Sequence, residues 1–250
     1  MSGSPVIEFD SVSKHFGDTV AVQDVSFTVR PGRVVGLLGR NGAGKTTSLR
    51  MLLGLARPTA GAATFFGQTY DQLPHAARRI GVSMEGIGPV TGVSARRDLL
   101  IWATALGLGR GRVDTVLDQV GLADAAGRKI KDFSTGMKQR HALAVALLAD
   151  PEVLILDEPA NGLDPDGIRW LRDILRSLAT EGRTVLMSSH LLSEIEQTVD
   201  DVVVIQETLC YAGTLDDLTG GGRDRLEDKF FELVGPRTPA ASLTGGGHDE

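Results

Sequence analysis

Residues 39–46, which read GRNGAGKT, are the segment of this sequence whose residue types and spacing are best suited to chemistry. They match the phosphate-binding pattern GxxxxGK[ST]. Glycines in such a loop let backbone N–H groups curl around phosphate oxygens, where side chains would clash. Lys45 would reach the β and γ phosphates, and the Thr46 hydroxyl would bind Mg²⁺. The predicted phosphate contacts come from Gly39, Asn41, Gly42, Ala43, Gly44, Lys45, Thr46 and Thr47.

A pair of adjacent carboxylates ends the apolar run VLILDE at residues 153–158. Carboxylates at the C-terminal end of a buried strand lie where open α/β sheets bind their ligands. Asp157 would hold Mg²⁺ directly or through water, and Glu158 would polarise an attacking water as a general base. The alternative is an acidic strand end that caps the next helix. The phosphate loop in the same chain favours the metal-binding and catalytic interpretation.

The elements that must position these groups follow from hydrophobic periodicity. The loop lies between residues 34–39, a continuous apolar run typical of a strand covered on both faces, and residues 46–55, which have helical spacing. Strands and helices alternate again in the second half of the chain, which is the βαβ signature of a parallel sheet. These segments are strand 153–157, helix 168–182, strand 184–189, helix 191–199 and strand 202–206. The sequence therefore predicts an α/β fold with a mostly parallel sheet.

Two regions depart from this alternation. Residues 6–10 and 24–29 predict strands of a half-buried antiparallel sheet, which would form an N-terminal β-subdomain. Residues 63–67 and 79–84 are further strand candidates. From about residue 87 to 148 the pattern becomes helical, so we expect an α-helical insertion between the strands.

Length and composition fit one folded domain with a short tail. Of the 250 residues, 42% are hydrophobic and 23% are charged, which excludes the disordered class. We expect one domain over residues 1–234 and a flexible tail over residues 235–250. The formal net charge of −6 argues against nucleic acid as a partner. The sequence has no bilayer-length apolar run and no export signal, so we expect a cytoplasmic protein.

Additional motifs, in a fixed order, make the sequence resemble the nucleotide-binding subunits of ABC transporters over residues 6–218. FSTGMKQR at residues 133–140 resembles the signature motif of that family, and PANGLDP at residues 159–165 resembles its D-loop. His190 is similar to the switch histidine that contacts the γ-phosphate. The resemblance implies a P-loop NTPase core that binds and hydrolyses ATP with Mg²⁺.

The resemblance also implies roles for residues outside the phosphate loop. Phe16 would stack on adenine, although a phenylalanine at a strand end is also a common core residue. Ser134, Thr135 and Gly136 would face the nucleotide held by a second subunit, and Asp164 would lie at the seam between the two. Each chain then carries two half-sites, so ATP would join two subunits. The partner would be a second copy of this chain or a related subunit.

Two departures from the family pattern mark this sequence. Glu85 stands where the family has a glutamine; it could still contact Mg²⁺ or its water, but its charge differs from that of an amide. The signature has Phe133, Thr135 and Met137 where Leu, Gly and Gln are usual. This form, together with RLEDKFFELV at residues 225–234, resembles the subgroup that powers ABC-2-type exporters, including the bacitracin-type and daunorubicin-type antibiotic exporters.

The expected function is therefore the ATP-hydrolysing subunit of an exporter of drugs, antibiotics or peptides. It would work with a separate polytopic membrane permease, on the inner face of the plasma membrane, and the permease would select the cargo. One alternative is a soluble ABC-type ATPase that is not coupled to transport, which normally has two such domains or a long coiled coil. A P-loop GTPase or small-molecule kinase would leave residues 133–140 and 159–165 unexplained.

Overall fold

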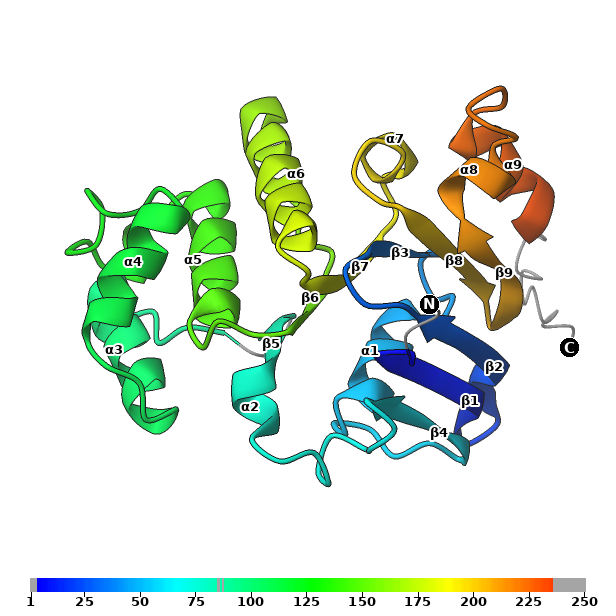
Figure 1. The fold of residues 1–250 in the computed structure, drawn as a ribbon, viewed down its shortest axis with the longest axis horizontal. Helices are drawn as coiled ribbons and strands as arrows, with labels where there is room; N and C mark the ends of the chain where they lie inside the picture. The colour runs from blue at the N-terminus through cyan, green and yellow to red at the C-terminus, as the bar shows by residue number, and fades with distance from the viewer. Residues whose placement is uncertain (1–3, 85, 87, 236–250) are drawn as a thin grey trace, which may run out of the picture.

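The computed structural model describes residues 4–84, 86 and 88–235, and its strands form two sheets (Figure 1). An antiparallel sheet has the order β2-β1-β4, with bounds Thr19–Val29, Ile7–Phe16 and Ala60–Phe65. The larger sheet has the order β5-β6-β7-β3-β8-β9, and its strands are parallel except for β9. Their bounds are Ile80–Ser83, Val153–Asp157, Thr184–Ser189, Val34–Leu38, Asp201–Gln206 and Thr208–Thr214. The predicted α/β fold with a mostly parallel sheet and an N-terminal antiparallel sheet is confirmed.

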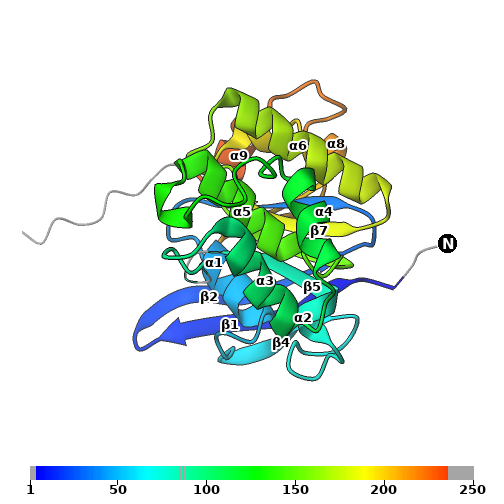
Figure 2. The same cartoon turned by 90° about the vertical axis from the view of Figure 1, so that its left-hand side faces the viewer.

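Helices surround the larger sheet and extend beyond one of its edges. α3, α4 and α5 pack together past β5, at the end of the molecule that faces the viewer in Figure 2. These three helices lie within the segment predicted to be a helical insertion. The helices are α1 Lys45–Leu52, α2 Ala76–Arg79, α3 Ala95–Ala105, α4 Gly111–Gln119, the 3₁₀ turn Ile130–Asp132, α5 Thr135–Leu147, α6 Pro165–Thr180, α7 Leu192–Ile195, α8 Leu215–Leu218 and α9 Leu226–Val234. Among the described residues no helix has both the length and the apolar character needed to cross a bilayer.

Strand β3 is buried on both faces, which explains its continuous apolar sequence. Val34 and Leu38 join the core formed with the helices of the insertion and α6. Val35 and Leu37 point to the opposite face and pack with α1 and the antiparallel sheet. Because side chains alternate along a strand, one five-residue element contributes to two cores. This double burial holds the end of β3, where the phosphate loop begins, in a fixed position.

The structure differs from the predicted elements at the C-terminal edge of the sheet. The helix expected over 191–199 is only Leu192–Ile195; the chain then continues as a turn in which the N–H groups of Thr198 and Val199 both donate to the Ile195 carbonyl. Strand β9 was not predicted. It pairs on one side only, so its side chains are nearly all half-exposed and show no apolar alternation. The predicted flexible tail, apart from Gly235, lies outside the described residues.

Candidate nucleotide-binding site

The predicted phosphate loop connects the end of β3 to the start of α1 and is packed closely against neighbouring backbone. Gly44 precedes α1 with a φ of 97°, a conformation that L side chains rarely adopt. A Cβ atom on Gly44 would lie 2.5 Å from the Ala21 carbonyl oxygen of β2. A Cβ atom on Gly39 would lie 2.5 Å from the Ile205 carbonyl oxygen of β8. The loop is therefore shaped by contacts with both sheets, and only glycine fits at these two positions.

A pocket of about 370 Å³ opens over this loop. The first residues of α1 line it, and because the N–H groups of a first helical turn have no intrahelical acceptor, this helix end favours an anion. The lining residues come from β2, the loop, α1 and the ends of β6 and β7. They are Ala21, Arg40, Asn41, Gly42, Ala43, Gly44, Lys45, Thr46, Thr47, Glu158, Asn161 and His190. Most of the predicted phosphate contacts and both predicted catalytic residues thus share one pocket.

Lys45 is the central cation of the pocket. Its side chain is only 7% exposed, and its ammonium donates to the carbonyl oxygens of Gly39 at 2.8 Å and Arg40 at 3.3 Å. The same ammonium lies 3.7 Å from Oε1 of Glu158. These partners hold the charge over the loop, where it would attract phosphate oxygens.

Asp157 and Thr46 meet at the edge of the pocket. Alternation along β6 directs Asp157 to the sheet face that α1 covers, so its Oδ2 lies 3.0 Å from the Thr46 hydroxyl. Mg²⁺ prefers hard oxygen donors and is usually bound by one or two carboxylates together with substrate phosphates. The carboxylate and hydroxyl present here fit that requirement. Glu85, the other predicted metal contact, lies outside the described residues.

Glu158 and His190 form a hydrogen-bonded pair at the mouth of the pocket. Oε2 of Glu158 lies 2.7 Å from Nδ1 of His190. Glu158 has a φ of 51°, so the chain leaves the strand direction directly after Asp157. Beyond the pair, burial raises the pKa of Glu194 on α7; the negative charge of Glu158 adds to this increase and His190 opposes it.

Phe16, the predicted adenine contact, lies at the end of β1. Its ring is 55% exposed, which excludes the alternative of a core phenylalanine. The Lys14 ammonium lies 4.8 Å from the ring centroid, in a cation–π contact. Phe16 does not line the pocket over the phosphate loop.

The signature and D-loop segments lie beside each other; Asn161 of the D-loop lines this pocket, whereas Ser134, Thr135, Gly136 and Asp164 are not among its lining residues. Ser134 caps α5 by accepting a hydrogen bond from the Met137 N–H at 3.2 Å. Asp164 caps α6 in the same way, accepting from the Gly167 N–H at 2.8 Å. The Thr135 methyl packs against Gly162, where a Cβ atom would lie 2.5 Å from it. Gly136 is next to Thr135 at the start of α5. The structure thus joins these two motifs to each other, and only Asn161 of the D-loop reaches the lining of the described pocket.

Several residues at the site were not predicted from the sequence. Arg40 and Asn161 line the pocket and lie inside the phosphate-loop and D-loop motifs, respectively. Their positions in these motifs could have identified them as site residues. Ala21 and Ser188 had no such signal, because only the pairing of distant strands brings them to the site. Ser188 donates to Oδ1 of Asp157 at 2.6 Å.

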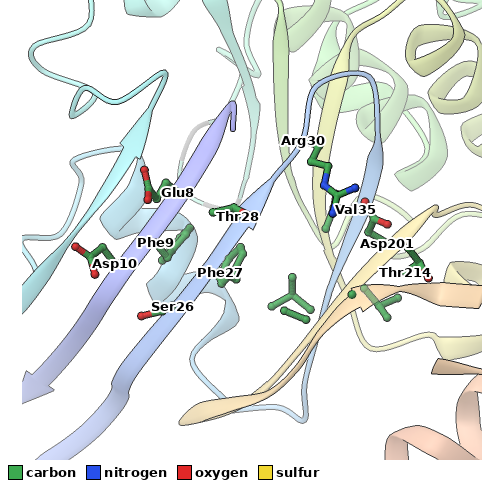
Figure 3. A pocket seen from close by; sticks show the side chains of 14 residues that line it. Glu8, Phe9, Asp10, Ser26, Phe27, Thr28, Arg30, Val35, Asp201 and Thr214 are labelled. Atoms are coloured by element: carbon green, nitrogen blue, oxygen red, sulfur yellow. The ribbon is translucent and has the colours of Figure 1, made fainter. Parts of the chain in front are cut away.

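Another pocket, of about 430 Å³, lies between the β1–β2 hairpin and the edge formed by β8 and β9 (Figure 3). Its lining includes the carboxylates of Glu8, Asp10 and Asp201, and Asp201 is paired with Arg33 at 2.9 Å. It contains none of the motif residues. Because carboxylates repel phosphate, this pocket is less suited to a nucleotide than the one over the phosphate loop.

Comparison with known proteins identifies the family. The sequence profile described as "ABC transporter" matches residues 22–161. The bacitracin transport ATP-binding protein BcrA of Bacillus licheniformis is 45% identical over 207 residues, which cover 82% of this chain and 68% of that protein. The Nod factor export ATP-binding protein I of Burkholderia orbicola (strain AU 1054) is 41% identical over 212 residues, which cover 83% of this chain and 69% of that protein. These relatives confirm the predicted resemblance to the exporter subgroup.

A solved structure of an ATP-binding subunit of an ABC transporter has the same fold. It superposes with a TM-score of 0.81 and 29% sequence identity, and the match covers 92% of this chain and 100% of that one. The family profile extends over more than half of the chain and includes the phosphate loop and the Asp157–Glu158 pair. The chain therefore belongs to the ABC transporter family, as a subunit that binds and hydrolyses ATP.

Proposed function

We propose that this chain drives an exporter by binding and hydrolysing ATP at the pocket over the phosphate loop. The observation that carries the proposal is the position of the Glu158 carboxylate, between the Lys45 ammonium and the His190 ring at the mouth of that pocket. This arrangement places a base, a phosphate-binding cation and a second polar group around one space. It suits the attack of water on a terminal phosphate.

Phosphate binding would begin with the loop and α1. Backbone N–H groups at the helix N-terminus and the Lys45 ammonium would hold the β and γ phosphates. Thr46 and Asp157 would hold Mg²⁺ beside them, and the bound ion would neutralise charge on the phosphate oxygens. The exposed ring of Phe16 offers a face for adenine once Lys14 moves aside.

Glu158 would act as the general base. Its carboxylate would accept a proton from the attacking water, while His190 would hold the carboxylate in place through Nδ1 and contact the γ-phosphate with its other ring nitrogen. The γ-phosphate would compete with Glu158 for the Lys45 ammonium. Nucleotide binding would thereby release Glu158 from Lys45 and leave it free to orient water.

A second ATP-binding subunit would complete the site. Ser134, Thr135, Gly136 and Asp164 do not line the pocket of their own chain, which supports a role at the pocket of a partner. Gly136 supports the same proposal, because among the described residues a Cβ atom there would meet only Leu163, at an ordinary 3.6 Å. Packing within the chain does not require glycine at this position, whereas the close approach of a phosphate would.

The export direction rests on the relatives, one named for bacitracin transport and one for Nod factor export. We infer that the chain acts at the inner face of the plasma membrane with a separate membrane permease. Antibiotic, drug or peptide cargo follows from the bacitracin relative, and the permease would select it.

The Glu158→Gln variant tests the catalytic part of the proposal. We expect the ATPase rate to fall by about 100-fold or more, because the amide is a far weaker base. ATP binding, measured with a fluorescent nucleotide, should persist, and ATP should stabilise a dimer detectable by light scattering. Glu8→Gln, a change of the same kind on an exposed face of β1, is the control. A Glu158→Gln protein with the wild-type ATPase rate would refute the assignment of the base.

Purification of the tagged chain from detergent-solubilised membranes tests the transport part. We expect a polytopic membrane protein in fixed stoichiometry with the chain, and an ATPase rate that changes when this complex forms. A chain that remains without a membrane partner in cells and still hydrolyses ATP would favour an ABC-type ATPase not coupled to transport.

A further inference from the structure

Ser188 occupies a fully buried position between the two carboxylate residues of the site. It lies on β7, in register with Asp157 on the neighbouring parallel strand β6. Alternation along the two strands directs both side chains to the face that α1 covers. The hydroxyl therefore lies beside the predicted metal-binding carboxylate without lining the nucleotide pocket.

The hydroxyl makes two hydrogen bonds whose directions are set by their partners. The Glu158 backbone N–H can only donate, so Oγ of Ser188 accepts from it at 2.9 Å. The ionised Asp157 carboxylate can only accept, so Oγ–H donates to Oδ1 at 2.6 Å. One side chain thus fixes the carboxylate of one residue and the backbone of the next.

The hydrogen bond with the Glu158 N–H acts at a strained point of the chain. Glu158 has a φ of 51°, in the left-handed region that non-glycine residues rarely adopt. The hydrogen bond from its N–H to Ser188 helps hold this conformation, which turns the Glu158 side chain toward Lys45 and His190. Asp157 would otherwise be free to rotate away from Thr46.

We propose that Ser188 is a positioning residue that sets Asp157 and Glu158 relative to each other for ATP hydrolysis. The proposal rests on the function proposed above for those two carboxylates. Ser188 is fully buried and does not line the nucleotide pocket. It acts by holding Asp157 toward Thr46 and Glu158 toward the γ-phosphate at the same time. Groups that orient metal-binding and catalytic residues in this way commonly contribute about 10- to 100-fold in activity or metal affinity.

The test compares Ser188→Ala, Ser188→Thr and a matched control. In Ser188→Ala we expect turnover to fall about 10- to 100-fold, with little change in the ATP affinity measured in EDTA. The gain in ATP affinity on adding Mg²⁺ should shrink, because Asp157 is less well held. Ser188→Thr keeps the hydroxyl and should recover most of the turnover. The control is Ser48→Ala, which removes another fully buried serine hydroxyl, one with no hydrogen-bond partner among the described residues.

A double-mutant cycle with Glu158→Gln separates this proposal from the proposed function. If Ser188 acts through Glu158, the loss caused by Ser188→Ala should be much smaller when Glu158→Gln is already present. Suppose that Glu158→Gln lowers the ATPase rate strongly but Ser188→Ala stays within about twofold of wild type. The role of Ser188 would then be overturned, while the proposed function would stand. Equal losses in Ser188→Ala and Ser188→Thr would also overturn it, since the hydroxyl would then be irrelevant. A wild-type rate in Glu158→Gln would instead overturn the proposed function.

Discussion

Nδ1 of His190 lies 2.7 Å from Oε2 of Glu158, and the other oxygen of that carboxylate lies 3.7 Å from the Lys45 ammonium. The carboxylate therefore connects three elements, the ends of β6 and β7 and the phosphate loop. A γ-phosphate bound to Lys45 would displace one of these contacts and leave the other. His190 would then be the remaining constraint on the orientation of the base.

His190→Ala should consequently reduce turnover more than it reduces ATP binding. We expect a loss of about 10-fold or more in the ATPase rate, because the base loses its orienting partner and the γ-phosphate loses a contact. A fluorescent nucleotide should bind with an affinity close to that of wild type, since Lys45 and the loop are intact. His75→Asn, at an exposed turn before α2, is the control. If ATP affinity and turnover fell by the same factor, the main role of His190 would be to bind ATP in the ground state.

Much of the site was predictable because motif spacing and strand order constrain it. The approach of Thr46 to Asp157 follows from two motifs at the C-terminal ends of β3 and β6, and the structure places these side chains 3.0 Å apart. Ser188 was not predictable. It is 31 positions from Asp157, and only the register between β6 and β7 brings the two together.

The elements of the fold also differ in how strongly the sequence predicts them. Strand β3, buried on both faces, was predicted from its apolar run, whereas β9, at the edge of the sheet, has no comparable pattern. The contact between Thr135 and Gly162 also lay beyond the sequence, because it depends on how α5 lies against the segment before α6. A local sequence pattern indicates which residues are buried. Contacts between distant segments, such as that of Thr135 with Gly162, depend instead on how whole elements are placed relative to one another.

The buried pair of Asp98 and His141 should dominate the stability of the helical region. Both side chains are fully buried; Oδ2 of Asp98 lies 2.9 Å from Nε2 of His141, and Oδ1 accepts from the Val90 N–H at 2.8 Å. Asp98→Ala would leave Nε2 of the buried His141 without this partner and remove the acceptor of the Val90 N–H, and we expect a loss of about 3–5 kcal/mol in the free energy of unfolding. Asp98→Asn keeps an acceptor for Val90 and should cost less.

Urea unfolding followed by circular dichroism measures these differences. Asp124→Ala, at an exposed position, should change stability by no more than about 0.5 kcal/mol and serves as the control. A loss in Asp98→Ala as small as the loss in Asp124→Ala would show that the buried pair contributes nothing to folding.

The contact between Thr135 and Gly162 predicts a coupling between the signature and D-loop segments. Gly162→Ala should destabilise the protein, because φ is 74° and the new Cβ atom would lie 2.5 Å from the Thr135 methyl. Gly182→Ala has a similar backbone cost at a φ of 91°, but no atom of the described residues lies within 4 Å of its new Cβ. This variant therefore measures the backbone cost without a clash.

Thr135→Gly removes the methyl and should relieve part of the defect of Gly162→Ala. We expect a coupling of about 0.5–3 kcal/mol between the two substitutions in thermal or urea unfolding. Combining Thr135→Gly with Gly182→Ala should give no coupling, since those residues do not touch. Strict additivity in the first pair would mean that α5 and the D-loop segment are not in contact in solution.

Glu194 makes the stability of the protein depend on pH in a direction that can be worked out. Burial raises the pKa of this carboxyl above the ordinary 4.5, and its Oε2 is buried with no hydrogen-bond partner in the part of the chain that the structure describes. The folded state therefore holds the Glu194 proton more tightly than the unfolded state does. As pH rises above 4.5, the unfolded chain loses this proton first, so the contribution of Glu194 to stability decreases until the folded carboxyl also ionises.

Glu194→Gln removes this titration, since the amide stays neutral at every pH. We expect the variant to be more stable than wild type at neutral pH, and the difference to vanish as the pH falls below 4.5, where the wild-type carboxyl is protonated. Thermal unfolding of both proteins over a series of pH values measures the difference directly, because groups common to the two cancel. Glu8→Gln, exposed on β1, should show no comparable dependence. A Glu194→Gln protein that loses stability at neutral pH would mean that the ionised carboxylate is stabilised in the folded state by a favourable contact.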